Sequence, residues 1–366
     1  MQAAICYEQN QPVRVEEVTL DPPKRGEIRV RMAAAGVCHS DLSAVRGVIT
    51  MKMPLVLGHE GAGVVEELGE GVTHLAVGEK VVLSWVTPCG VCFFCRHGKP
   101  NLCEVGERIN QSNRMMDGTS RVKKHGRDLH VYSALGTMAE YAVVPANAAV
   151  KVPDDAPLDK CALLGCAVTT GVGAVLNTAR VEAGSSVVVF GAGGVGLNVI
   201  QGAAIAGAER IIAVDAQPRK LEMARTFGAT HLVDASKEDA KKAVRGLTDG
   251  RGADYAFEAI GRKETVEQAY AATRRGGTCV VIGIGSFQES ASFNLFALPV
   301  TEKKLMGSFY GGCNVHVDVP RMLALYRAGK LKLDELVTRT YELGEVNEAF
   351  ADMTSGANAR GVITFS

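Results

Sequence analysis

The sequence has little of several features that would assign it to a particular class of protein. Its 40 basic residues balance its 40 acidic residues, so no net charge attracts it to nucleic acid or to an anionic membrane. Aromatic residues make up only 5% of the chain. The N-terminus lacks a basic segment followed by an apolar one, and no apolar run is long enough to cross a bilayer. We therefore expect a cytoplasmic protein that binds a small molecule, not nucleic acid or a membrane.

Hydrophobic residues and cysteines, by contrast, are plentiful. Of 366 residues, 47% are hydrophobic and 22% are charged, which is enough apolar surface for large cores and favours two domains. The chain has ten cysteines. Because the cytosol keeps thiols reduced, these cysteines indicate metal binding or catalysis rather than a disulfide framework.

The hydrophobic pattern changes near residue 158. Before about residue 150, alternating runs such as EIRVRMAAAG and AGVVEELG are broken by Gly and Pro, which predicts an antiparallel, β-rich domain. Beyond it, strand-like and helix-like segments alternate, which predicts βαβ units around a parallel sheet. We predict a catalytic β-rich domain at 1–167 and a nucleotide-binding domain at 168–308, with 309–366 returning to the first domain.

A glycine motif follows the strand-like segment 187–190. The sequence GAGGVG places Gly191, Gly193 and Gly196 in the G-x-G-x-x-G pattern that binds a dinucleotide pyrophosphate at a helix N-terminus. Asp215 ends the next strand-like run, where a carboxylate accepts hydrogen bonds from a ribose 2′-OH and repels a 2′-phosphate. NAD is therefore favoured over NADP, with Lys220 a second candidate for the ribose. Glycines that serve only a tight turn are the alternative.

Four cysteines lie in the segment CGVCFFCRHGKPNLC. Four thiolates on one short loop can enclose a tetrahedral zinc ion with no open position, which is typical of a structural site. Disulfides are a poor alternative under reducing conditions, and a nucleic-acid-binding zinc ribbon normally separates its two C-x-x-C pairs by about 15–20 residues. The predicted structural ligands are Cys89, Cys92, Cys95 and Cys103.

A second metal site is suggested by Cys38, His59 and a cysteine near residue 166. Two thiolates and one imidazole leave a fourth tetrahedral position open, as in a catalytic zinc site. His59 by itself is as readily explained as a turn residue. Spacing alone does not decide between Cys166 and Cys161.

The motifs GVCHSD, LGHEGAG, PCGVCFFCRHGKPNLC, DGTSR, GCAVTTG, GAGGVG and ARGVITF occur in this order. Together they resemble the zinc-dependent medium-chain alcohol dehydrogenases over essentially the whole chain, with the long loop (103–139) of the liver-type and glutathione-dependent members. The resemblance implies a GroES-like catalytic domain with a zinc lobe at about 88–104, and a doubly wound Rossmann domain. It also implies NAD, two zinc ions per chain, and a homodimer or homotetramer that pairs edge strands, for which 303–312 is the candidate.

The resemblance also assigns roles to individual residues. It selects Cys166 over Cys161 as a ligand of the catalytic zinc, with Cys38 and His59. It places His39 and Arg360 at the cofactor pyrophosphate and Thr170 at the nicotinamide. Trp85 stands where the family usually has an aromatic residue of the substrate pocket, and a place in the hydrophobic core is the alternative. Chemically, Ser40 is suited to take the alcohol proton toward solvent, and Asp41 and Glu60 to orient the zinc ligands.

We therefore expect hydride transfer from a zinc-bound primary alkoxide to NAD, with aromatic or allylic alcohols favoured by Trp85. The sequence departs from some relatives at Ser43, where a relay histidine is found. It carries Ile49 and Glu107 where the glutathione-dependent enzymes have an acid and an arginine. The alternatives are an S-(hydroxymethyl)glutathione dehydrogenase, a nicotinoprotein that retains its NAD, and a zinc-stabilised NAD-binding protein without turnover.

Overall fold

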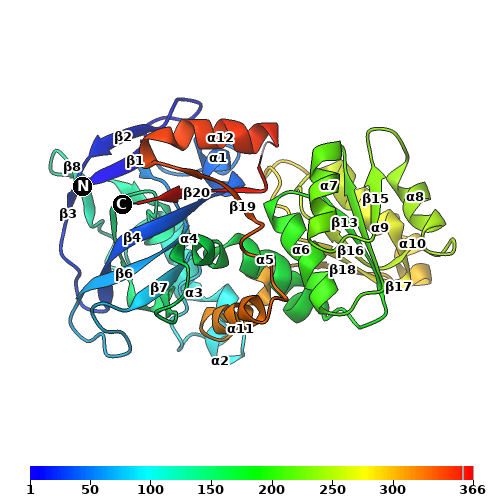
Figure 1. Ribbon diagram of the computed structural model, residues 1–366, viewed down its shortest axis with the longest axis horizontal. Helices are drawn as coiled ribbons and strands as arrows, with labels where there is room; N and C mark the ends of the chain where they lie inside the picture. The colour runs from blue at the N-terminus through cyan, green and yellow to red at the C-terminus, as the bar shows by residue number, and fades with distance from the viewer. Residues whose placement is uncertain (357, 366) are drawn as a thin grey trace. The chain divides into compact units, whose positions relative to one another are not determined.

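The computed structural model describes residues 1–356 and 358–365, which form two compact units (Figure 1). The first unit contains Met1–Cys166, Asn314–Ala324 and the chain from Leu336 onward. The second contains Ala167–Cys313 and Leu325–Glu335. Each unit has its own sheets and its own core, so each is described by itself.

The first unit is rich in β-structure, as its alternating sequence predicts. Its strands are β1 (Gln2–Cys6), β2 (Arg14–Glu17), β3 (Thr19–Leu20), β4 (Glu27–Val37), β5 (Leu55–Val56), β6 (Glu60–Leu68), β7 (Lys80–Ser84), β8 (Val122–Lys124), β9 (Arg127–Asp128), β10 (His130–Val131), β11 (Tyr141–Pro145), β12 (Ala149–Lys151), β19 (Val337–Tyr341) and β20 (Arg360–Thr364). The largest sheet has the order β12-β7-β6-β4-β20-β19, with β11 also paired to β4. The other sheets are β10-β5-β1-β2 and β3-β8-β9.

Helices of this unit are short and connect its strands. They are α1 (His39–Val45), α2 (Phe93–Arg96), α3 (Glu104–Ser112), α4 (Leu158–Cys161), the start of α11 (Val315–Arg327) and α12 (Val346–Ser355), with short 3-10 turns η1 (Pro100–Leu102), η2 (Tyr132–Ala134), η3 (Ala146–Ala148), η4 (Ala162–Gly165) and η7 (Leu343–Glu345). The four-cysteine segment contains α2 and η1, and its last cysteine, Cys103, directly precedes α3.

Strand β4 organises the first unit. It pairs with β6, β11 and β20, so the C-terminal strand lies beside an N-terminal one (Figure 1). Its second half, from Ala33 to Val37, has only small or β-branched residues, which suit a strand enclosed by neighbours. The strand ends at Val37, and Cys38 is the N-cap of α1.

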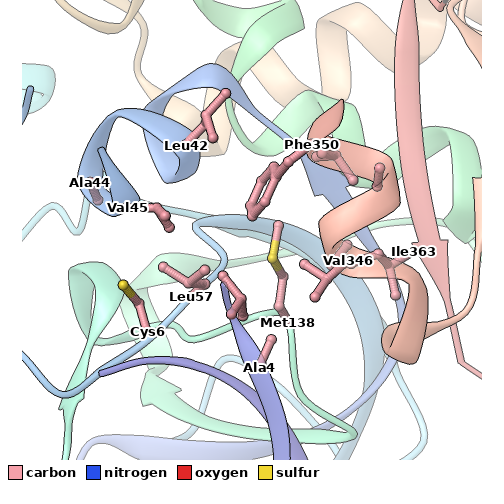
Figure 2. Packing of buried hydrophobic residues seen from close by; sticks show 14 of the residues in the cluster. Ala4, Cys6, Leu42, Ala44, Val45, Leu57, Met138, Val346, Phe350 and Ile363 are labelled. Atoms are coloured by element: carbon pink, nitrogen blue, oxygen red, sulfur yellow. The ribbon is translucent and has the colours of Figure 1, made fainter. Parts of the chain in front are cut away.

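A buried hydrophobic cluster fixes α1 in place (Figure 2). Leu42 and Val45 of α1 face Leu57, Met138 and Phe350, which come from three other parts of the chain. Burying such side chains stabilises by roughly 1.5–3 kcal/mol each. Helix α1 is therefore held by residues from both the N-terminal and the C-terminal parts of the chain. This packing also fixes the position of the polar residues at the start of the helix. The cluster as labelled in Figure 2 contains Ala4, Cys6, Leu42, Ala44, Val45, Leu57, Met138, Val346, Phe350 and Ile363.

The second unit has a parallel sheet with the order β15-β14-β13-β16-β17-β18, the strand order of a Rossmann fold. Its strands are β13 (Ser186–Phe190), β14 (Arg210–Asp215), β15 (His231–Asp234), β16 (Ala253–Glu258), β17 (Thr273–Val281) and β18 (Lys304–Gly307). Its helices are α5 (Ala167–Gly173), the π-helix η5 (Ala174–Ala179), α6 (Gly194–Ile205), α7 (Pro218–Thr226), α8 (Ala240–Gly246), α9 (Lys263–Ala272) and α10 (Ala297–Thr301), with the 3-10 turn η6 (Tyr310–Gly312). The predicted fold class, a β-rich GroES-like domain and a Rossmann domain, is confirmed.

Two segments depart from the predicted division of the chain. We assigned all of 309–366 to the first domain, but the second unit runs on to Cys313 and also contains Leu325–Glu335. The backbone N–H of Lys332 donates to Gln201 Oε1 at 2.9 Å, and its Nζ donates to the carbonyl of Thr226 at 2.5 Å. Such long-range hydrogen bonds leave no local sequence signal, so the hydrophobic pattern could not predict them.

No single helix within 1–356 and 358–365 combines the length and apolarity needed to cross a membrane. The helical segments Leu158–Gly165 and Ala167–Ala179 reach that threshold only as a bent pair.

Candidate active site

Three potential metal ligands from distant parts of the sequence come together in the first unit. Cys38 follows β4, His59 precedes β6, and Cys166 follows η4. One ligand atom from each residue lies within 4.8 Å of the other two. All three side chains are buried, with exposed fractions of 7%, 2% and 7%. Among the described residues, Cys161 joins no such group.

Two glycines and one carboxylate allow this convergence. Gly58 has φ +97°, and a Cβ there would lie 2.3 Å from the backbone nitrogen of Met138. Its N–H donates to Asp41 Oδ1 at 2.9 Å, which ties the turn before His59 to helix α1. A Cβ on Gly165 would lie 2.3 Å from the carbonyl oxygen of Leu83. Side chains at either glycine would therefore push a ligand away from the cluster.

Asp41 also orients His59. Its Oδ2 lies 3.1 Å from His59 Nδ1, and the carboxylate is fully buried. Burial by itself lowers the pKa of His59, but the charges of Asp41 and Cys38 outweigh burial and raise the pKa to about 10. A carboxylate on one ring nitrogen is the usual device for directing the other nitrogen toward a metal.

The pKa values of the two thiols are shifted in opposite directions. A hydrogen bond with Cys166 outweighs burial and, with the charge of His59, holds the pKa of Cys38 well below its ordinary value. The same hydrogen bond, followed by burial, raises the pKa of Cys166 well above its ordinary value. The nearby side chain of Trp85 acts in the opposite direction and lowers the pKa of Cys166. Trp85 thus lies beside the cluster while it also packs against a hydrophobic core.

These residues fit a zinc ion. Both ring nitrogens of His59 are buried and make no hydrogen bond within the described residues, although buried polar atoms are nearly always paired. Nδ1 has the Asp41 carboxylate 3.1 Å away, which leaves Nε2 as the nitrogen without a charged neighbour of this kind. Two sulfurs and one imidazole nitrogen are the donor set of a zinc site with one open position. An ion on Nε2 and the two sulfurs would satisfy the orphaned nitrogen.

Glu60 and Arg360 form a buried ion pair next to the cluster. Arg360 Nη2 donates to Glu60 Oε1, and the two side chains are 5% and 0% exposed. A Cβ on Gly36 would lie 2.6 Å from the Glu60 carboxyl, so the glycine makes room for it. The sequence suggested both residues but not their pairing. Contact of Arg360 with a pyrophosphate stays a prediction.

The remaining predicted residues of this region lie around α1. His39 begins the helix and is exposed, whereas Ser40 Oγ lies 3.7 Å from Cys38 Sγ. Tyr132, which the sequence analysis missed, packs its ring 4.8 Å from the His59 ring. Its hydroxyl donates to the carbonyl of Ser40 at 3.5 Å. No motif marks Tyr132; only its place in the long loop could have drawn attention to it.

The four cysteines of the zinc lobe also converge. The sulfurs of Cys89, Cys92, Cys95 and Cys103 lie within 4.8 Å of one another, and Cys103 is 2% exposed. Backbone N–H groups of Cys89 and Cys92 donate to Cys103 Sγ and Cys89 Sγ at 3.2 and 3.3 Å. A backbone hydrogen bond from Cys95 lowers the pKa of Cys92 to about 6. Four sulfurs with N–H donors around them fit a closed zinc site.

The glycine turn of the second unit has the predicted geometry. Gly191 follows β13 with φ +94°, and a Cβ on Gly196 would lie 1.7 Å from the carbonyl oxygen of Gly191. A Cβ on Gly193 would meet nothing within 4 Å, so the space above it is open. Asp215 accepts from the N–H of Ala192 at 2.8 Å, which links it to the same turn. Thr170 lies on α5 and Lys220 on α7, both half-buried.

Comparisons with known proteins agree with this geometry. The chain matches the family "alcohol dehydrogenase GroES-like domain" over residues 24–154 and the family "zinc-binding dehydrogenase" over residues 194–328. An NDMA-dependent alcohol dehydrogenase of Amycolatopsis methanolica is 41% identical over 368 residues, covering 100% of this chain and 98% of the relative. An S-(hydroxymethyl)glutathione dehydrogenase of Synechocystis sp. is 41% identical over 368 residues, covering 99% of both chains. The crystal structure of benzyl alcohol dehydrogenase from Acinetobacter calcoaceticus has a TM-score of 0.95 and 32% identity, covering 100% of this chain and 99% of that chain.

The two cysteine clusters predict distinct effects of single substitutions. Cys92→Ser should release one zinc ion and lower the melting temperature, because a structural zinc contributes directly to folding free energy. Cys38→Ser should lose the other ion but keep a folded chain that binds NADH. Elemental analysis of zinc per chain, with thermal melting and NADH fluorescence, measures both.

Cys161→Ser is the matched control, since Cys161 is fully buried and close in sequence to Cys166 but outside the cluster. It should keep two zinc ions. Retention of both ions by Cys92→Ser would contradict the structural site, and loss of an ion from Cys161→Ser would contradict the choice of Cys166.

Proposed function

Because this chain belongs to the zinc-dependent medium-chain alcohol dehydrogenases, which use NAD and zinc, we propose that it oxidises primary alcohols to aldehydes, preferring aromatic or allylic alcohols. The observation that carries the proposal is the buried cluster of Cys38, His59 and Cys166 with the unpaired His59 Nε2. A protein that only binds NAD has no need of a three-ligand site with an open fourth position.

The proposed reaction removes one proton and one hydride from the alcohol. Zinc, when bound by Cys38, His59 and Cys166, supplies a Lewis acid that favours loss of the hydroxyl proton near neutral pH. Ser40, whose hydroxyl lies 3.7 Å from Cys38 Sγ, accepts that proton and passes it toward solvent. The hydride goes to NAD, and the products are the aldehyde and NADH. Asp41 serves the reaction by keeping His59 in one orientation.

The preference for aromatic alcohols rests on Trp85. Its side chain influences the pKa of Cys166, so Trp85 lies near the cluster. An aromatic wall next to the reacting carbon stabilises an apolar substrate by roughly 25 cal/mol per Å² of buried apolar surface. A solved relative of similar fold is a benzyl alcohol dehydrogenase. Tyr132 adds a second aromatic ring next to His59.

The second candidate is an S-(hydroxymethyl)glutathione dehydrogenase, because one relative bears that name. A glutathione adduct brings two carboxylates, which need cationic partners when they leave water. Glu107, where the glutathione-using relatives have an arginine, is exposed on α3 and would repel them. Arg108 lies next to it, with Nε directed to the carbonyl of Glu104 at 3.4 Å. An enzyme that retains NAD between turnovers remains a further alternative.

Steady-state kinetics with NAD test this proposal. We expect kcat/KM for benzyl or cinnamyl alcohol to exceed that for S-(hydroxymethyl)glutathione by about tenfold or more, or about 1.4 kcal/mol of transition-state binding. Trp85→Ala should reduce kcat/KM more for benzyl alcohol than for ethanol, because ethanol leaves most of the indole uncovered.

Trp85→Phe is the control for lost aromatic area and should restore most of the preference. Oxidation of formaldehyde only in the presence of glutathione, with benzyl alcohol nearly inert, would establish the second candidate instead. A rate of alcohol oxidation that does not depend on added NAD would indicate that the enzyme retains its cofactor.

Cofactor choice is predicted from Asp215. A 2′-phosphate beside this carboxylate meets like-charge repulsion in a partly desolvated site, so NAD should be preferred over NADP by on the order of a hundredfold, or about 2.7 kcal/mol. Asp215 accepts from the N–H of Ala192 and from the N–H of Gln217, and Asp215→Asn removes the charge while keeping an acceptor for one of these two groups, so it should erode the preference with the chain still folded. The ratio of kcat/KM for the two cofactors measures this, and equal use of both by the wild type would refute it.

We also propose that the chain pairs with a second copy through β18. This strand ends the parallel sheet, and its Leu305 and Met306 are 39% and 37% exposed. Leu295 and Phe296, which precede α10, are 84% and 78% exposed, and exposed apolar side chains beside an open sheet edge are typical of an interaction surface.

Light scattering should return twice or four times the chain mass of 38.7 kDa. Met306→Lys should shift the population toward the single chain because it buries a charge at the proposed contact, whereas Lys304→Gln should not. A wild-type protein of 38.7 kDa at micromolar concentration would exclude pairing.

A further inference from the structure

The second unit has a cavity of about 740 Å³ at the amino ends of its parallel strands. Ser186 and Arg210, which begin β13 and β14, line it together with Asp254 of β16 and Arg274 of β17. The glycine turn that begins at Gly191 follows the opposite end of β13. The cavity and the dinucleotide turn therefore lie at opposite ends of the same strands.

Arginines dominate the lining of this cavity. Five of them come from β14, α8, the loop after α8 and β17, against three carboxylates. The arginines are Arg210, Arg245, Arg251, Arg274 and Arg275, and the acids are Glu209, Asp249 and Asp254.

Three of the arginines neutralise the three acids. Arg274 Nε donates to Asp254 Oδ1 at 2.6 Å, and Ser186 occupies the other carboxylate oxygen. Arg251 donates to Asp249 at 2.9 Å. Arg210 lies 3.7 Å from both Glu209 and Asp249. The acids are thus already paired within the lining.

Arg245 and Arg275 are the two arginines of the lining that are not paired with its acids. Both are exposed, and neither has a carboxylate partner among the described residues; Arg275 donates only to the carbonyl of Val300, at 3.1 Å. Burial, and then the charges of Arg245 and Lys241, lower the pKa of Lys303, so further cations lie close by. Like charges gathered in this way repel one another, and a bound anion would relieve the repulsion.

We propose that this cavity binds a small molecule carrying two or more phosphate groups, held by Arg245 and Arg275. Guanidinium groups match phosphate oxygens with two parallel N–H donors, and two separated guanidiniums suit two linked phosphates. The volume lies within the range of small-ligand sites. Gly250 also lines the cavity, and a Cβ there would meet nothing within 4 Å, so a ligand can approach the backbone. The proposal is independent of the alcohol dehydrogenase activity.

The experiment is calorimetric titration of inorganic pyrophosphate into the enzyme saturated with NADH, so that the dinucleotide site is filled. Wild type is compared with Arg245→Ala/Arg275→Ala and with the single variant Arg245→Gln. Arg225→Ala is the matched control, since Arg225 is an exposed arginine of α7 outside the lining. Alcohol oxidation by each variant serves as the check that the chain is folded.

We expect wild type and Arg225→Ala to bind pyrophosphate alike, Arg245→Gln to bind more weakly, and the double variant to lose roughly tenfold or more in affinity. Affinity should fall as salt is raised. No binding to wild type at millimolar pyrophosphate, or equal binding to wild type and the double variant, would overturn the site. Tighter binding of citrate than of pyrophosphate would overturn the assignment to phosphates.

Discussion

Cys166 reaches the other two potential ligands because the residue before it has no side chain. Gly165 packs directly on the carbonyl of Leu83 and on the backbone of Glu60, the residue after His59. Gly36 and Gly58 allow equally close approach on the other sides, where the Glu60 carboxyl and the Met138 backbone lie. Any Cβ at these contacts would overlap backbone or a buried carboxyl. Close packing of the backbone in the sheet therefore sets the geometry of the cluster and positions the side chains of its three potential ligands.

This packing confines many charges to a small buried volume. Asp41 and Glu60 are fully buried, and each has a basic side chain beside it, His59 and Arg360 respectively. A buried charge without its partner costs several kcal/mol. Each ion pair therefore holds together the two chain segments from which its side chains come. Cys38 Sγ and His59 Nε2 belong to the same cluster, and a divalent cation bound there would compensate the negative charge of the thiolates that hold it.

The second unit offers anions two kinds of hydrogen-bond donor, backbone N–H groups at one end of its strands and arginine side chains at the other. At the carboxyl ends of its strands, small residues and a helix N-terminus leave backbone N–H groups accessible, the arrangement that suits a dinucleotide pyrophosphate. At the amino ends, long arginine side chains surround a wide cavity. Backbone donors require glycines at fixed positions and thus leave a motif. Side chains gathered from several elements leave none, so the arginine cavity was invisible to sequence analysis.

The sequence by itself determined those features whose residues are neighbours along the chain: the glycine turn after β13, the four-cysteine lobe, and the change from a β-rich to an alternating pattern. Their geometry depends on a few consecutive dihedrals or on one loop, so local composition encodes it. The spacing of the residues left Cys166 and Cys161 open, and the family resemblance implied Cys166, which is the cysteine that meets Cys38 and His59. Only the tertiary structure decided that Arg360 pairs with Glu60, that Tyr132 packs on His59, and that Leu325–Glu335 joins the second unit. These contacts join residues far apart in sequence, and their energies come from burial and close packing, which no short stretch of sequence contains.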